Sequence, residues 1–150
     1  MGLLMEGVIL TPLKIIPTVG GDVLHGMKCI DPGFVGFGEA YFSTVNYQDI
    51  KPWKKHLRMT LNVVVPFGEI RFVLHDDRVH SQTNGKVITL CLSRENNYQR
   101  LTVPPDIWMA FQGLSKPYSM LLNVADMLHD PNEVERCELE KFAYEWEIKE

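Results

Sequence analysis

A histidine stands inside a run of positive charge between residues 51 and 59. The run reads KPWKKHLRM, and its ionisable members are Lys51, Lys54, Lys55, His56 and Arg58. Four cations disfavour a further positive charge, so we expect the imidazole to be neutral near neutral pH, the form that a general base requires. The same cations are suited to bind phosphate oxygens. A basic loop with an incidental histidine is the alternative interpretation.

A second group of potential ligands lies at residues 75–80, with two histidines and two aspartates. His75 and His80 are five positions apart, so on a strand they point to opposite faces, and Arg78 lies between them. The sequence contains no His-x-His pair of the kind that metal-binding cupins typically show. We therefore favour a solvated strand end over a metal site, and keep a metal-dependent cupin as a minor alternative.

Motifs for other chemistries are absent from the sequence. No Gly-x-Ser-x-Gly occurs, and no cysteine stands in an evidently electropositive setting. Gly33, Gly36 and Gly38 lead into a strand-like segment, whereas a dinucleotide-binding turn would open a helix. Neither nucleophilic catalysis nor a phosphate-binding glycine loop is indicated.

Length and composition indicate a globular protein with its own hydrophobic core. A chain of 150 residues, 45% hydrophobic and 23% charged, is expected to form a single domain over residues 1–150. The net charge of −4 argues against a nucleic-acid partner. Cys29, Cys91 and Cys137 form no C-x-x-C pair and are expected to be free thiols in a reducing compartment. With no signal peptide or membrane span recognised, we expect a cytoplasmic protein.

The elements that must position the histidine are short strands. They are five to nine residues long, rich in β-branched and aromatic residues, and separated by Gly, Pro, Asn and Asp clusters, which predicts an all-β sandwich, jelly roll or barrel. Asn84-Gly85 predicts a tight turn, and Pro66-Phe67-Gly68 predicts a break between two strands. In the segment EIRFVLHDD, alternate residues share one apolar face, and Val73 on the other face indicates that this second face is partly covered. Helix-like spacing of apolar residues at 139–146 predicts a short C-terminal helix.

The stretch LSRENNYQRLTVPPDIWMAF, residues 92–111, is similar to a segment of a known enzyme family, and the similarity extends in order along the chain. The matching positions are Leu92, Ser93, Glu95, Asn96, Gln99, Pro104 and Phe111, with Gly68-Glu69-Ile70, Asp76, Arg78 and Gly85-Lys86 upstream, and Gly20, Gly21 and Asp22 before them. On these residues the chain resembles the dTDP-4-dehydrorhamnose 3,5-epimerase family. The matches span residues 11–131.

The resemblance implies a cupin-type double-stranded β-helix (jelly roll) and a sugar-nucleotide epimerase or isomerase of carbohydrate and polysaccharide biosynthesis. In that family a histidine removes a proton next to the C4 ketone of a 4-keto-6-deoxy sugar nucleotide. A cation stabilises the resulting enolate, and a tyrosine returns a proton on the opposite face. The resemblance implies a homodimer and neither a cofactor nor a metal.

Carried over to this sequence, the resemblance assigns His56 as the base. Lys54 or Arg58 would stabilise the enolate or the diphosphate, and Tyr118, or else Tyr144, would replace the family's acid. The residues expected to bind substrate are Trp53, Lys55, Arg58, Tyr98, Arg100, Trp108 and Asn123.

The sequence also departs from the family at several functional positions. Asn123 stands where the family has its tyrosine, Met109 where it has a second histidine, and Trp53 where an arginine precedes the base. The family's C-terminal Leu-Ser-x-Lys-Asp segment, whose aspartate orients the histidine, has no counterpart. Single epimerisation and ketoisomerisation therefore stand beside double epimerisation. The alternative from another class is a non-catalytic jelly-roll module that binds a sugar nucleotide or a protein.

Overall fold

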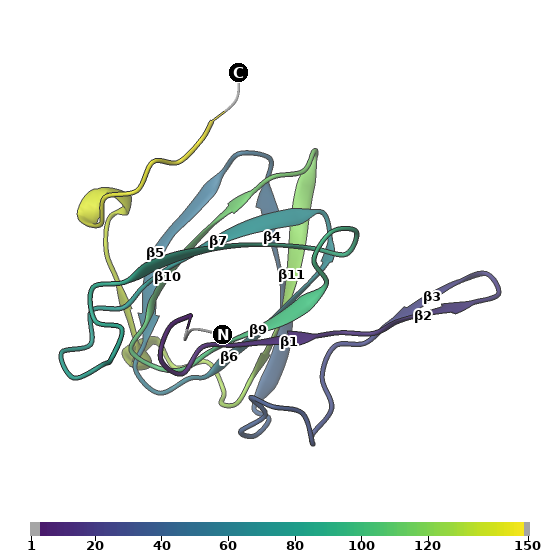
Figure 1. Ribbon diagram of the computed structural model, residues 1–150, viewed down its shortest axis with the longest axis horizontal. Coiled ribbons are helices and arrows are strands. Elements are labelled where there is room, and N and C mark those ends of the chain that lie inside the picture. Colours follow the sequence, from purple (N-terminus) through teal and green to yellow (C-terminus); the bar gives the residue numbers. More distant parts are fainter. Residues whose placement is uncertain (1–3, 149–150) are drawn as a thin grey trace.

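The computed structural model describes residues 4–148, which form twelve β-strands and two 3-10 helices (Figure 1). One five-stranded sheet has the order β1 (Ile9–Pro12), β9 (Gln99–Val103), β6 (Leu61–Phe67), β11 (Tyr118–Ala125), β4 (Glu39–Asn46). The other has the order β12 (Val134–Arg136), β5 (Ile50–His56), β10 (Trp108–Gly113), β7 (Glu69–His75), β8 (Val87–Ser93). All pairings in both sheets are antiparallel, and the prediction of an all-β jelly roll is confirmed.

The main core lies between the two sheets, and strand β7 shows why. Ile70, Phe72 and Leu74 are fully buried in this core, as their alternate spacing predicted. Val73, on the opposite face of β7, is equally buried because the C-terminal part of the chain covers the outer face of its sheet. The expected covering of this second face is therefore confirmed.

The break predicted at residues 66–68 separates β6 from β7. Gly68 has a φ of 77°, and a Cβ at this position would lie 2.4 Å from the Ser119 hydroxyl oxygen. Only glycine meets both constraints without strain, because a side chain disfavours this φ and would collide with Ser119. The predicted turn at Asn84-Gly85 is also present, with Gly85 at a φ of 85°.

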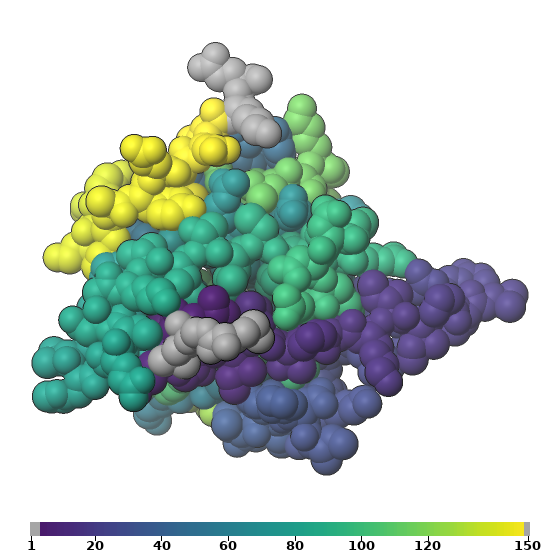
Figure 2. Space-filling model, viewed as in Figure 1, coloured from purple at the N-terminus to yellow at the C-terminus, as the bar shows by residue number. Residues whose placement is uncertain are grey.

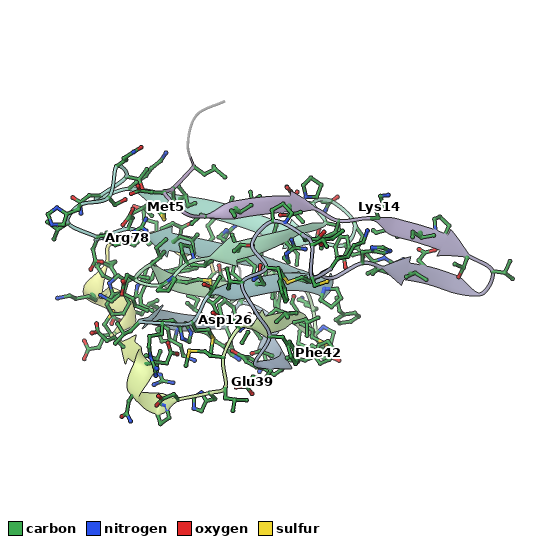
Figure 3. All side chains as sticks on the ribbon, turned by 90° about the horizontal axis from the view of Figure 1, so that it is seen from below. Met5, Lys14, Glu39, Phe42, Arg78 and Asp126 are labelled. Carbon is green, nitrogen blue, oxygen red and sulfur yellow. The ribbon has the colours of Figure 1, made fainter. Side chains whose placement is uncertain are left out.

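A two-stranded hairpin projects from the rest of the molecule. Strands β2 (Ile15–Thr18) and β3 (Gly21–Leu24) pair only with each other among the described residues, and they extend well away from both sheets (Figures 1 and 3). The turn between them contains Gly20 and Gly21, both at positive φ. Apolar side chains remain exposed on this hairpin, most of all Val19 at its tip.

The C-terminal helix that the apolar spacing predicted is limited to one 3-10 turn, η2 (Leu139–Lys141). The residues on either side of this turn are extended and lie along the outer face of the β5 sheet (Figure 1). We refer to residues 137–148 as the C-terminal strap. Its aromatic side chains pack on Trp53 and Trp108, so the spacing that indicated an amphipathic helix instead reflects contacts with this sheet face.

The long connection between β7 and β8 is organised by Asp76, which is fully buried. Its carboxylate accepts hydrogen bonds from the Arg78 guanidinium, Ser81 and Thr83, at 2.6–2.9 Å. Burial alone would raise the pKa of Asp76, but these hydrogen bonds outweigh it and hold the pKa well below the usual range. Figure 3 places Arg78 at the end of the molecule away from the β2–β3 hairpin, and both Arg78 and Thr83 hydrogen-bond the Glu6 backbone, so this network ties the loop to the N-terminal segment.

We expect Asp76→Asn to lower the free energy of unfolding by about 3 kcal/mol, because the partly buried Arg78 guanidinium loses the counter-charge of a fully buried carboxylate. The folded-state pKa of Asp76 is depressed, so its stabilisation is fully present above the ordinary carboxyl pKa of about 4 and is lost as the pH falls through the lower folded value. Urea unfolding at pH 7 and at acidic pH measures both effects. Asp49→Asn, at an exposed position, should change stability by less than about 0.5 kcal/mol. A difference between Asp76→Asn and the parent protein that grows as the pH falls would contradict this assignment.

The three cysteines are free thiols, as expected from their spacing. Within residues 4–148, no helix has the length and apolar character that crossing a membrane requires.

Candidate active site

A pocket opens between the two sheets, on the side where β4 and β5 lie. Its free volume, counted to the open mouth, is about 610 Å³. Leu61, Val63, Met109, Phe111 and Leu121 form its apolar wall as a continuation of the core. The polar lining comes from β4, β5 and β11 and consists of Tyr41, Ser43, Lys51, Lys54, His56 and Asn123.

An irregularity in the pairing of β5 with β10 turns both Lys51 and Lys54 into this pocket. Lys54 pairs with Met109 and Lys51 with Phe111, so three residues of β5 span the distance that two residues of β10 span. In a regular strand, residues three apart would face opposite sides of the sheet. The extra residue near Pro52 therefore places two cations on the face that also carries His56.

His56 is held by a carboxylate from the other end of the chain. Its Nδ1 lies 2.5 Å from Oε1 of Glu133, which belongs to the 3-10 helix η1 (Pro131–Glu133). With Nδ1 turned to this carboxylate, Nε2 is the ring nitrogen left to exchange a proton with a bound molecule. A histidine oriented in this way and lining a pocket is suited to accept a proton from a bound molecule.

Glu133 is in turn fixed by the backbone at the end of β5. Its Oε2 accepts hydrogen bonds from the backbone N–H groups of Arg58 (3.2 Å) and Met59 (3.1 Å). Burial disfavours the charged carboxylate, but the hydrogen bonds from His56 and from these two N–H groups prevail, so the pKa of Glu133 lies below its ordinary value. The carboxylate is thus ionised and directed at the histidine.

The nearest charge to His56 is therefore negative, and the sequence pattern had suggested only cations. Arg58 forms an ion pair with Asp130 at 2.6 Å, and Lys55 with Glu135 at 3.5 Å. Both cations are directed away from the imidazole. The like-charge repulsion expected from the sequence is therefore not the contact that the structure shows: the group that touches the imidazole is a carboxylate, and it orients the ring.

A tyrosine that the sequence analysis did not select lies in the same pocket. The Asn123 side-chain oxygen accepts a hydrogen bond from the Asn62 N–H at 3.0 Å, which fixes the orientation of the amide. The Asn123 Nδ2 then donates to the Tyr41 hydroxyl oxygen, also at 3.0 Å. Because the phenol oxygen accepts here, its own proton is free to be donated elsewhere, and Tyr41 lines the pocket.

The two lysines give the pocket its positive charge. Lys51 donates to the Ser43 hydroxyl at 2.9 Å. Burial lowers the pKa of Lys54, and the nearby charges of Arg136 and Lys51 lower it further. A lysine with a lowered pKa stabilises negative charge and releases a proton more easily than an ordinary lysine.

Three of the predicted site residues lie on the opposite face of the β5 sheet. Trp53 and Trp108 pack against the strap, and the Trp108 Nε1 donates to Asp77. Lys55 lies over the Trp108 ring with its Nζ 5.0 Å from the ring centre. All three are outside the pocket lining: Trp108 lies on the strap side of the sheet, and Met109, its neighbour, lies on the pocket side.

Four further predicted residues also lie outside the pocket lining. Arg58 is in its surface ion pair, and Tyr98 donates its hydroxyl proton to the His25 carbonyl. Arg100 is fully buried and donates to the carbonyl oxygens at positions 26 and 32. Tyr118 begins β11, pairs with Asn46 and packs on Phe67, outside the pocket lining. Of the predicted set, the pocket brings together His56, Lys54 and Asn123.

Glu133, Tyr41 and Lys51 also belong to the polar site. The sequence analysis assigned no role to Glu133 or Tyr41, and it considered Lys51 only as one of four cations suited to bind phosphate. Lys51 belongs to the basic run already noted. Regular alternation would place it on the face opposite Lys54, so only knowledge of the strand irregularity would have assigned it to the pocket. Glu133 and Tyr41 are distant from His56 in sequence, and no local motif connects them. The His75–His80 group does not form a site: Asp76 is engaged with Arg78, and His75 stacks on Phe142. No cluster of three or more metal-ligating side chains occurs within residues 4–148.

The jelly roll and its pocket, with a carboxylate-oriented histidine, a phenol and two lysines, define an enzyme of the cupin class that acts on a small molecule. The sequence matches no protein-family model. A crystal structure described as a dTDP sugar isomerase from Desulfovibrio desulfuricans is 36% identical, with a TM-score of 0.91, covering 97% of this chain and 95% of that one. On this similarity, the chain belongs to the family of dTDP-sugar isomerases and dTDP-4-dehydrorhamnose 3,5-epimerases.

Two further relatives are less similar to this chain than that isomerase is. The probable low-salt glycan biosynthesis epimerase Agl13 of Haloferax volcanii is 30% identical over 92 residues, 61% of this chain, and the match spans 58% of that relative's length. A dTDP-6-deoxy-D-glucose-3,5-epimerase structure from Legionella pneumophila has a TM-score of 0.85 at 18% identity, covering 100% of this chain and 84% of that one. This last similarity shows the shared fold.

Proposed function

We propose that this protein is a nucleotide-sugar epimerase or isomerase that removes a proton next to the ketone of a 4-keto-6-deoxy sugar nucleotide. The observation that carries the proposal is the His56–Glu133 pair in a pocket that also holds a phenol and two ammonium groups. The names of the Desulfovibrio isomerase and of the Haloferax epimerase support the same class of reaction.

In this reaction Nε2 of His56 takes the proton from the carbon beside the ketone. The electron pair of the broken C–H bond moves into the carbonyl, and the enolate oxygen becomes negatively charged. Lys54, with its lowered pKa, stabilises that charge, and Lys51 adds to the positive potential of the site. The Glu133 carboxylate stabilises the imidazolium that forms.

Tyr41 is the group suited to return a proton to the intermediate. It comes from β4 in one sheet, whereas His56 comes from β5 in the other, so the two approach a bound sugar from different walls. Reprotonation of the same carbon on the opposite face would give an epimer. In a ketoisomerisation the C3 hydroxyl proton moves to the C4 oxygen, the returned proton is added to C4, and the new ketone forms at C3.

We expect solvent deuterium to enter C3 or C5 of a 4-keto-6-deoxy nucleotide sugar incubated with the protein in heavy water. Mass spectrometry of the recovered sugar measures the exchange, and proton NMR shows whether one centre, two centres or the carbonyl position changed. Absence of exchange with every 4-keto-6-deoxy sugar nucleotide, while the protein still binds them, would favour the non-catalytic binding module instead.

We also propose that the protein is a homodimer. Strand β4 is an edge of its sheet and exposes Phe42, and the projecting hairpin exposes Ile16, Val19 and Val23. An unpaired edge with apolar side chains is a surface that pairing with a second chain would cover.

Light scattering at micromolar concentration should report the mass of two chains, and Phe42→Asp should shift the protein toward the monomer. Val79→Asp is the matched control, because Val79 is 82% exposed in a loop away from this edge. A monomeric parent protein, or equal effects of the two variants, would overturn the proposal.

A further inference from the structure

The carboxylate that orients His56 belongs to a segment with little structure of its own. Glu133 ends a 3-10 helix of three residues, and the strand that follows it, β12, is also three residues long. Strand β12 pairs only with β5 among the described residues, at the positions of His56, Lys55 and Lys54. Short elements of this kind are marginal unless tertiary contacts hold them.

Those contacts are supplied by the strap, which continues directly from β12 and is fastened around Trp53. The Cys137 N–H donates to the Trp53 carbonyl at 3.2 Å, and the Trp53 Nε1 donates to the Leu139 carbonyl at 3.0 Å. Trp53 is only 1% exposed. It lies three residues before His56 on β5, with its side chain on the other face of the sheet.

Phe142 is the central side chain of the strap. Its ring meets Trp53 edge-to-face at 5.2 Å between centroids, stacks on His75 at 4.2 Å and lies 5.5 Å from Trp108. It thereby connects the strap to β5, β7 and β10 together. Farther along, Gln112 donates from Nε2 to the Glu147 carbonyl at 2.8 Å. Figure 2 shows the strap, in yellow, lying over one side of the molecule.

We propose that the strap positions Glu133, and through it His56, with Phe142 as the positioning residue. Phe142 touches neither the pocket nor His56, and it acts by holding β12 against β5 so that the carboxylate stays within hydrogen-bonding distance of the imidazole. The inference rests on the proposed function for its kinetic part, but the hydrogen bond itself can be observed in the free protein.

The first measurement is the proton NMR spectrum of the protein without substrate. A short hydrogen bond from His56 Nδ1 to Glu133 should give a proton signal far downfield, which Glu133→Gln removes. We expect Phe142→Ala to remove or broaden that signal, and Phe142→Tyr, which retains the ring, to keep it. Phe67→Ala is the matched control, because its ring packs on Tyr118 away from the strap, and the signal should be unchanged.

The second measurement is kinetic and uses a double-mutant cycle. Phe142→Ala should lower kcat about 10- to 100-fold with little change in KM, since a small misplacement of a catalytic group has effects of this size. In a Glu133→Gln background the same substitution should have no further effect on kcat, because the group that it positions is already lost. Thermal unfolding confirms that the variants are folded, and Trp146→Ala, at a more peripheral strap position, replaces Phe142→Ala if the latter does not fold.

An unchanged downfield signal in folded Phe142→Ala would overturn the proposal, as would multiplicative effects of Phe142→Ala and Glu133→Gln on kcat. If Phe142→Ala loses the downfield signal while the parent protein shows no exchange with any keto sugar, the role of the strap is supported and the proposed function is refuted. The two proposals therefore fail separately.

Discussion

Replacing His56 with glutamine should lower kcat by about 10²- to 10⁴-fold, the contribution typical of a general base. Glutamine retains a hydrogen-bonding side chain but cannot take up the proton, so the step that breaks the C–H bond is lost. Deuterium entry at the carbon beside the ketone should fall by the same factor as product formation, because both depend on that step. Binding of the sugar nucleotide, measured by calorimetry, should change far less than kcat.

The matched control for this prediction is His80→Gln, which changes an exposed histidine in the β7–β8 loop. This variant should retain the deuterium exchange and turnover of the parent protein. Full exchange in His56→Gln would show that His56 is not the base, and it would contradict the proposed reaction.

Tyr41→Phe should separate exchange from turnover. If the phenol returns the proton, product formation should fall about 10²-fold or more. His56 can still remove a proton and return one from solvent to the same face, so deuterium should continue to enter the substrate. Asn123 loses only the hydroxyl acceptor of its Nδ2, so the fold should be retained.

Two other tyrosines test this assignment. Tyr47→Phe removes a hydroxyl outside the pocket lining and should leave both rates unchanged. Tyr118→Phe tests the acid suggested by the sequence resemblance. A loss of turnover in Tyr118→Phe, with normal turnover in Tyr41→Phe, would return the role of acid to Tyr118.

The sequence alone was sufficient for the fold class and for the family. Alternation along strands such as β7, and glycines at turns such as Gly68, are local properties, and local properties can be interpreted one segment at a time. The matches to the family are also local: each is a short motif, and the motifs occur in the same order along the chain. His56 and Lys54 were found because they lie close together in one basic segment, and the pocket contains both.

Only the tertiary structure could identify the partners of His56. Glu133 is 77 residues from His56, and Tyr41 reaches the pocket from the opposite sheet. The position of Lys51 on the same side as Lys54 and His56 depended on the irregular pairing of β5 with β10, which alternation in the sequence could not show. Trp53 and Trp108, expected to contact substrate, instead face the strap, and no local pattern showed that the C-terminal segment covers this side of the sheet. The sequence determined which strands form and supplied the base, whereas the packing of distant segments decided which groups surround it.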